Sequence, residues 1–126
     1  GAPIADIFAK TTGTDGDFVV KVIDVYPEEV ATDPKMGGYQ LPISLDIFRG
    51  RYRNSFEKPE PMKPGKIYEV TIDLGATSNV FAAGHRIRLD VSSSNYPKIE
   101  PNAHPARNSV YHDARRSSYL ELPVVR

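Results

Sequence analysis

Apolar and polar residues alternate in short runs along most of this chain. The clearest run follows Gly84, where Ile87, Leu89 and Val91 alternate with three charged residues. Successive side chains of a β-strand point to opposite faces, so this pattern predicts a strand with one apolar and one polar face. Similar alternation predicts further strands at residues 43–53, 68–74 and 119–125, and residues 4–10 can form a first strand.

Residues 18–26 differ from the other runs because apolar side chains occupy both alternating sets of positions. Phe18, Val20 and Val22 would lie on one face, and Val19 and Ile23 on the other. A strand that is apolar on both faces is typical of a central position with cover on each side. We therefore expect this strand to lie in the middle of its sheet.

Turn-forming residues separate these runs. The eleven prolines and nine glycines fall between the apolar segments, and residues 28–38, 54–64 and 95–108 are interpreted as loops. The pattern predicts about seven or eight strands, no convincing helix and no domain boundary within residues 1–126. The expected fold is a single all-β domain, a β-sandwich of jelly-roll type.

Composition narrows the classes of function. The 126 residues include 40% hydrophobic residues, enough for one packed core, and no apolar run approaches the roughly 18 residues of a membrane-spanning helix. The formal net charge is zero, which argues against nucleic acid as a partner, and no membrane partner is expected. The absence of cysteine excludes disulfides, thiolate zinc sites and a cysteine nucleophile.

Serine-hydrolase chemistry would require a nucleophile on a sharp strand-to-helix turn, usually within G-x-S-x-G. The sequence contains no such motif, and Ser92, Ser93 and Ser94 end a predicted strand instead. His112 and Asp113 are adjacent in sequence, but neighbouring residues of an extended segment point to opposite faces. We therefore predict no catalytic residue in this chain.

The histidines and the first acidic turn offer only weak metal-binding patterns. His85, His104 and His112 lack the helical spacing of a zinc pair, although His104, His112 and Asp113 could still converge in space. Asp15 and Asp17 resemble part of a calcium loop that lacks its closing glutamate. We interpret this turn as solvated, and we predict neither a metal site nor a cofactor.

Three arginines alternate at positions 49, 51 and 53, with Tyr52 between them. In a continuous strand, Arg49, Arg51 and Arg53 would share one face and form a basic stripe. Arginine and tyrosine are enriched at protein interfaces, so a contact surface is the preferred interpretation. The alternative is a solvated edge whose arginines pair with Glu57, Glu60 and Glu69.

Several ordered segments resemble one family across nearly the whole chain. They are residues 11–27 (TTGTDGDFVVKVIDVYP), 49–59 (RGRYRNSFEKP), 84–97 (GHRIRLDVSSSNYP), 110–113 (VYHD) and 120–124 (LELPV). Together they resemble the C-terminal domain of X-Pro dipeptidyl-peptidase-like serine hydrolases, the family of cocaine esterases and α-amino acid ester hydrolases. The agreement of several segments in order makes this resemblance far more specific than a single motif.

The resemblance implies a jelly-roll β-sandwich similar to galactose-binding domains. It also implies a parent esterase, acylase or dipeptidyl peptidase whose catalytic serine, aspartate and histidine lie in a preceding α/β-hydrolase domain. This chain would then be inactive alone and would pack on that domain, helping to shape its substrate pocket without a cofactor. A homo-oligomer is a further partner that the resemblance leaves open.

The candidate site is therefore an interface rather than a catalytic centre. Its predicted residues are Arg49, Arg51, Tyr52, Arg53, Asn95, Tyr96, His112 and Asp113. The alternative is an autonomous module that binds a carbohydrate or another small ligand, because the seven tyrosines could stack on sugar rings. Fold alone does not decide between these functions.

Overall fold

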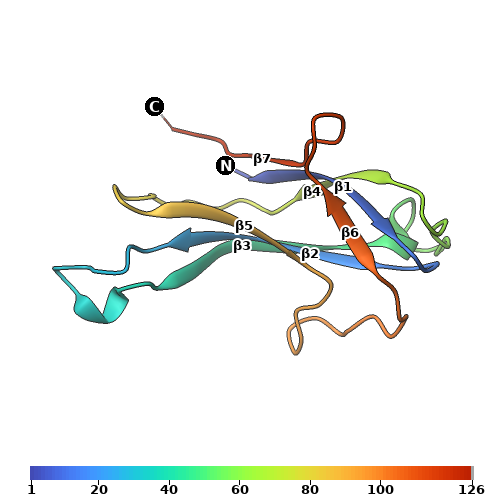
Figure 1. Ribbon diagram of the computed structural model, residues 1–126, viewed down its shortest axis with the longest axis horizontal. Coiled ribbons are helices and arrows are strands. Elements are labelled where there is room, and N and C mark those ends of the chain that lie inside the picture. The colour runs from blue at the N-terminus through green and yellow to red at the C-terminus, as the bar shows by residue number, and fades with distance from the viewer. Residues whose placement is uncertain (126) are drawn as a thin grey trace.

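A computed structural model describes residues 1–125, and its seven strands form two antiparallel sheets (Figure 1). Apart from two short 3-10 turns, η1 (Pro34–Met36) and η2 (Gly50–Tyr52), the described residues contain no helix. The strands are β1 (Ile4–Thr11), β2 (Asp17–Val25), β3 (Gln40–Arg49), β4 (Tyr68–Asp73), β5 (Arg86–Ser92), β6 (Asn108–Tyr111) and β7 (Tyr119–Glu121).

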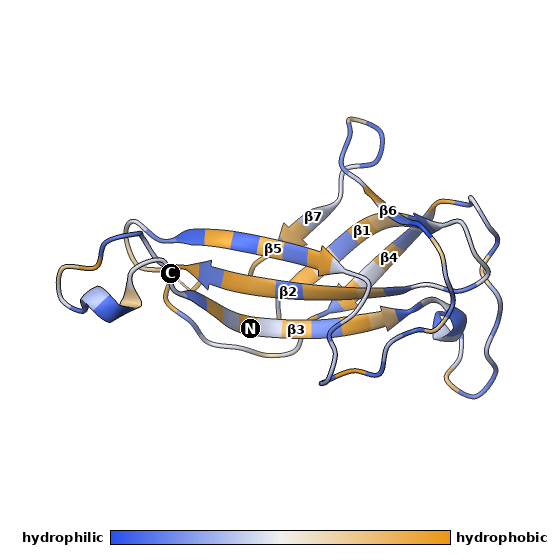
Figure 2. Ribbon diagram, turned by 60° about the horizontal axis from the view of Figure 1, so that its bottom comes forward, coloured by the Kyte–Doolittle hydropathy of each residue, from blue (hydrophilic) through white to orange (hydrophobic). Residues whose placement is uncertain are grey.

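The first sheet has β1 at its centre. Strand β4 pairs with one edge of β1, while β6 and β7 share the other edge, opposite residues 8–11 and 4–6 respectively. The second sheet has the order β3-β2-β5, so β2 is central as the sequence predicts. Figure 2 shows β5, β2 and β3 side by side, with the most continuous hydrophobic colour on β2.

The core lies between the two sheets and is built by alternation. Ala5, Ile7 and Ala9 of β1 are buried together with the inward residues of β2 and β4. The remaining buried members of this cluster are Phe18, Val20, Val22, Val70, Ile72 and Leu74. Because each sheet buries one face against the other, the fold is a β-sandwich, as predicted.

The outer face of β2 is also covered. Val19 and Ile23 are 0% and 5% exposed on the face opposite the main core. The segment of residues 93–107, which connects β5 to β6, contacts this outer face. Lys21, which lies on the same face as Val19 and Ile23, donates a hydrogen bond from Nζ to Asn95 Oδ1 at 2.7 Å. The expectation of cover on both faces of this strand is therefore confirmed.

Three features of the fold differ from the sequence prediction. The run at residues 43–53 stops being a strand at Arg49, and the last strand ends at Glu121 rather than at residue 125. The four-residue strand β6 was not predicted: it begins at Asn108, the last residue of the segment interpreted as a loop, and so short a sequence gives little periodic signal. No helix among the described residues is long and apolar enough to cross a membrane.

Candidate functional site

Asp15, in the turn between β1 and β2, connects three segments that are distant in sequence. Its carboxylate is only 4% exposed, and Oδ1 accepts hydrogen bonds from the backbone N–H groups of Gly16 and Arg51. Its Oδ2 accepts from the Arg51 guanidinium at 3.3 Å and from Asn102 Nδ2 at 2.9 Å. One buried carboxylate thus joins the turn, η2 and the loop of residues 93–107.

Asp17 adds a second buried carboxylate. It is 2% exposed, lies 3.7 Å from the Arg49 guanidinium and has no hydrogen-bond partner at either oxygen among the described residues. Burial raises the pKa of Asp17 above its ordinary 3.8, against smaller opposing effects of Asn102 and Arg49. The prediction of a solvated turn is therefore wrong, because arginines from β3 and η2 enclose both aspartates.

The raised pKa of Asp17 predicts a pH-dependent difference from the Asp17→Asn variant. A carboxyl with a higher pKa in the folded state binds protons more readily there, so its ionised form opposes folding at neutral pH. We expect wild type to gain stability relative to Asp17→Asn as pH falls through the folded pKa towards 3.8. The gain is about 1.4 kcal/mol per unit of pKa difference, measured by urea unfolding across pH. A pH-independent difference between the two proteins would contradict this prediction.

The alternating basic stripe expected at residues 49–53 does not form. Strand β3 ends at Arg49, and the backbone turns through η2 at Gly50–Tyr52. Arg51 turns to Asp15, whereas the Arg53 guanidinium donates to three backbone carbonyls, those of Gly50, Glu60 and Pro61. Each of these two arginines holds a loop of its own chain, with Arg53 also 3.9 Å from the Glu60 carboxylate.

The other predicted residues divide between two places. Tyr52 faces Arg51, whose guanidinium lies 5.2 Å from the ring centre, and the loop of residues 93–107 carries Asn95 and the 73% exposed Tyr96. His112 and Asp113 instead begin the turn before β7, which both ribbon views place away from that loop (Figures 1 and 2). The structure therefore does not bring all eight candidate residues into one site.

Within their own turn, His112 and Asp113 have local partners. The Nδ1 atom of His112 lies 3.2 Å from the Ser118 carbonyl oxygen. Asp113 accepts hydrogen bonds from the backbone N–H groups of Arg115 and Arg116, and these bonds lower its pKa. No catalytic geometry arises here, since the two side chains serve the turn rather than a common reacting centre.

A buried histidine–aspartate contact was not anticipated from the sequence. His85 Nδ1 lies 2.8 Å from Asp24 Oδ1, and Asp24 is 2% exposed within the apolar strand β2. The His85 ring also packs on Tyr26, with 4.2 Å between ring centres. The available signal was an acidic residue, Asp24, inside the mostly apolar run of residues 18–26, because buried charges in proteins are usually paired. This contact fastens the turn before β5 onto β2.

The structure gives no support to the metal patterns weighed from the sequence. His104 lies near Asp15, with 3.9 Å between its Nδ1 and Oδ2, whereas His112 belongs to the other turn. Among residues 1–125, no three histidine, aspartate or glutamate side chains converge closely enough to hold a metal ion.

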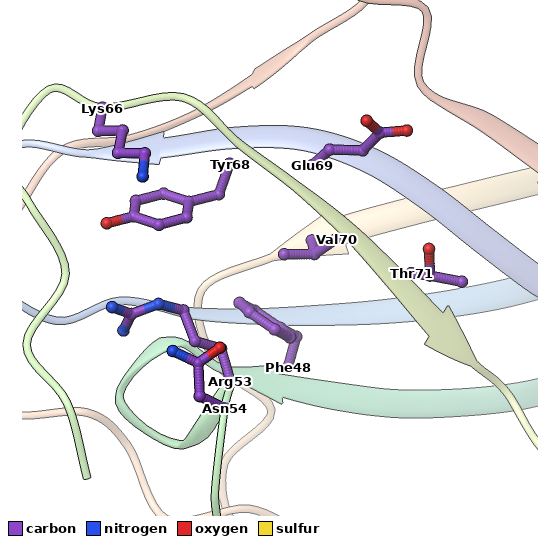
Figure 3. A pocket seen from close by; sticks show the side chains of 8 residues that line it. All are labelled: Phe48, Arg53, Asn54, Lys66, Tyr68, Glu69, Val70 and Thr71. Atoms are coloured by element: carbon purple, nitrogen blue, oxygen red, sulfur yellow. The ribbon is translucent and has the colours of Figure 1, made fainter.

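A polar pocket of about 440 Å³ lies beside β4 and η2. Figure 3 shows Lys66 and Arg53 flanking the ring of Tyr68, and their charged groups lie 4.8 and 5.2 Å from its centre. These two cationic groups already contact the Tyr68 ring, on which a sugar in this pocket would have to stack. The residues around this pocket are Phe48, Arg53, Asn54, Lys66, Tyr68, Glu69, Val70 and Thr71.

A larger apolar cleft, of about 560 Å³, is lined by residues from both ends of the described chain, Gly1 and Val125 among them. We call it the terminal cleft. Its rim exposes large apolar side chains: Val80 is 85% exposed, Ile87 49% and Val124 80%. Its other lining residues include Pro3, Val22, Ile43, Phe81, Leu122 and Pro123. Contiguous exposed apolar surface of this kind is typical of a contact with another protein surface.

Comparison with known proteins shows that this chain is similar to one part of several longer proteins. Residues 1–121 match the family model for the X-Pro dipeptidyl-peptidase C-terminal non-catalytic domain. The cocaine esterase of Rhodococcus sp. (strain MB1 Bresler) is 34% identical over 140 residues, which cover 100% of this chain and 23% of the esterase.

Two solved structures share the fold closely. An α-amino acid ester hydrolase has 43% identity and a TM-score of 0.91, over 99% of this chain and 23% of its own. An aminopeptidase from a marine sediment archaeon, Thaumarchaeota archaeon, has 40% identity and a TM-score of 0.92, over 100% of this chain and 23% of its own. The chain thus spans less than a quarter of the length of each of these relatives.

Proposed function

Because this chain belongs to the family of X-Pro dipeptidyl-peptidase C-terminal non-catalytic domains, we propose that it supports the catalytic domain of a larger serine hydrolase. Residues 1–126 would be one domain of that parent chain. The terminal cleft is the observation that carries the proposal, since its exposed valines and Ile87 leave apolar surface in water. Burying that surface against an α/β-hydrolase domain would stabilise both parts.

The loop of residues 93–107 is the part proposed to reach the substrate pocket. It is long, yet Asp15 holds it at Asn102 and Lys21 holds it at Asn95. Between these anchors, Tyr96 remains 73% exposed and free to contact another surface. A loop fixed at both anchors can present a side chain with little further loss of conformational freedom on binding.

The alternative of an autonomous sugar-binding module has less support. The aromatic ring in the polar pocket is flanked by Lys66 and Arg53, and the Arg53 guanidinium is committed to backbone carbonyls. A sugar would have to displace these interactions before it could stack on Tyr68. The parent's substrate class, whether peptide, ester or acyl amide, would be set by the catalytic domain.

The proposal predicts that a charge in the terminal cleft weakens the parent enzyme. In the full-length protein, Val80→Glu should lower the melting temperature by several degrees and reduce ester hydrolysis, because docking would bury the new carboxylate. Phe56→Glu is the matched control, since Phe56 is 90% exposed in a loop outside the cleft. Equal behaviour of the two variants in calorimetry and in the hydrolysis assay would refute docking at this cleft.

A further inference from the structure

The outer face of the first sheet carries a group of unpaired carboxylates. Since Ala5, Ile7 and Ala9 of β1 point into the core, Asp6 and its alternate neighbours point outward. The register places residues of β4 and β7 beside them on the same face. We call this surface the acidic face, and its carboxylates are those of Asp6, Glu69, Asp73 and Glu121. Among the described residues, none of the four forms an ion pair with a cationic side chain.

Asp6 lies at the centre of this face and is the exceptional member. Thr71 of β4 and Tyr119 of β7 lie directly opposite it on either side. Asp6 is 8% exposed, and its Oδ1 atom is buried without a hydrogen-bond partner among the described residues. Buried carboxylates in proteins are normally paired or hydrogen-bonded, since desolvation of an unpartnered one is costly. One oxygen of this buried carboxylate, Oδ1, is therefore left without a partner in the described part of the chain.

The surroundings of Asp6 favour a cation as the missing partner. The pKa of the half-exposed Tyr119 phenol is raised by its hydrogen bond with Asp6 and further by the charges of Asp6, Glu121 and Glu69. The outward cation of β1, Lys10, lies over the ring of Tyr111 instead, 5.6 Å from its centre. A negative field around an exposed aromatic ring suits a guanidinium group, which can pair with a carboxylate and stack on a ring.

We propose that the acidic face binds an arginine-bearing segment of the catalytic part of the parent chain, and that the arginine pairs with Asp6. The inference rests on the proposed function and adds a second contact surface with a defined partner chemistry. Charge complementarity carries it: the chain has no net charge, yet the four carboxylates of this face form no ion pair among the described residues. The neighbouring cations Lys10 and Arg116 lie over the ring of Tyr111 instead. A metal ion is a poorer occupant, because no three acidic or histidine side chains of residues 1–125 converge closely enough to hold one.

The test uses photo-cross-linking in the full-length parent. A benzophenone amino acid replaces Thr71, an exposed residue directly opposite Asp6, and a second protein carries it at Val80 in the terminal cleft. Irradiation followed by peptide mass spectrometry should join residue 71 to an arginine-containing peptide outside residues 1–126. Adding Glu69→Lys, Asp73→Lys and Glu121→Lys should reduce that adduct about tenfold or more through like-charge repulsion.

The two labels separate the failure of this inference from that of the proposed function. An adduct at Val80 but none outside residues 1–126 at Thr71 would overturn the acidic-face proposal and leave docking at the cleft intact. An adduct at Thr71 that persists in the lysine variant, or that lacks arginine, would also overturn it. No adduct at either position would overturn both proposals.

Discussion

Replacing Asp15 with alanine is expected to lower the free energy of unfolding by about 3–5 kcal/mol, the range for breaking a buried ion pair from one side. The change removes a carboxylate that is 4% exposed and accepts hydrogen bonds from Gly16, Arg51 and Asn102. It would leave the Arg51 guanidinium without its ion pair and detach Asn102 from the turn. Chemical denaturation of wild type and variant measures the loss.

The same variant should also show which part of the structure is destabilised. Amide hydrogen exchange is expected to accelerate in residues 93–107 more than in β1 and β2, because the loop loses its anchor while the core keeps its packing. Asp46→Ala is the matched control: Asp46 is exposed on β3 and should change stability by at most about 0.5 kcal/mol. Unchanged exchange in residues 93–107 would show that Asp15 does not position this loop.

In the full-length parent, the Asp15→Ala variant also tests the place proposed for the loop. If residues 93–107 contribute to the substrate pocket, kcat/KM should fall by more than the folded fraction explains. Asp15→Asn keeps the size of the side chain and one acceptor oxygen, so its kcat/KM should be intermediate between those of wild type and Asp15→Ala. A kcat/KM that follows only the folded fraction would place the loop outside the pocket.

The strands could be predicted from the sequence because the residue pattern that specifies a strand is local. Alternation identified β4 and β5, and a run apolar on both faces identified β2 as central. A period of two is a direct consequence of strand geometry, so it needs no knowledge of the partner strand. The family was likewise evident from ordered segments, and the match over residues 1–121 confirms it.

The candidate site was far less accessible because its contacts join distant residues. Asp15 and Asn102 are 87 positions apart, and the local sequence around either residue does not indicate that the two are hydrogen-bonded. Sequence reasoning treated Asp15 and Asp17 as a solvated turn and placed their arginine partners on a separate stripe. The aspartates and the arginines were each noticed in the sequence. Their pairing depends on how η2 turns back towards the start of β2, which the sequence pattern does not reveal.

The end of β3 at Arg49, immediately before Gly50, explains why the prediction of an arginine stripe was wrong. The Gly50 N–H donates to the Gly16 carbonyl at 2.9 Å, so the backbone runs against the turn that holds Asp15. A Cβ atom at Gly50 would lie 2.1 Å from Met62 Sδ and 2.8 Å from the Gly16 carbonyl oxygen. Only glycine allows this close approach, whereas alternation alone treats position 50 as an ordinary strand residue.

Gly50→Ala is accordingly expected to cost about 3 kcal/mol, the upper end of the usual range for overpacking a core. Met62 is 2% exposed and has little room to move, and the second clash is with backbone rather than with a flexible side chain. Gly65→Ala is the control: its φ of +76° imposes backbone strain of about 1–2 kcal/mol, but no atom crowds its Cβ. Urea unfolding of both variants compares crowding with strain.

A double-mutant cycle identifies the source of the cost. Met62→Ala alone should destabilise by about 2–5 kcal/mol through the cavity it leaves, yet it also removes the sulfur that a Cβ at position 50 would strike. The two changes together should therefore cost less than the sum of their separate effects, by at least about 0.5 kcal/mol. Strict additivity would mean that Met62 does not confine Gly50, and that the bend at the end of β3 has another cause.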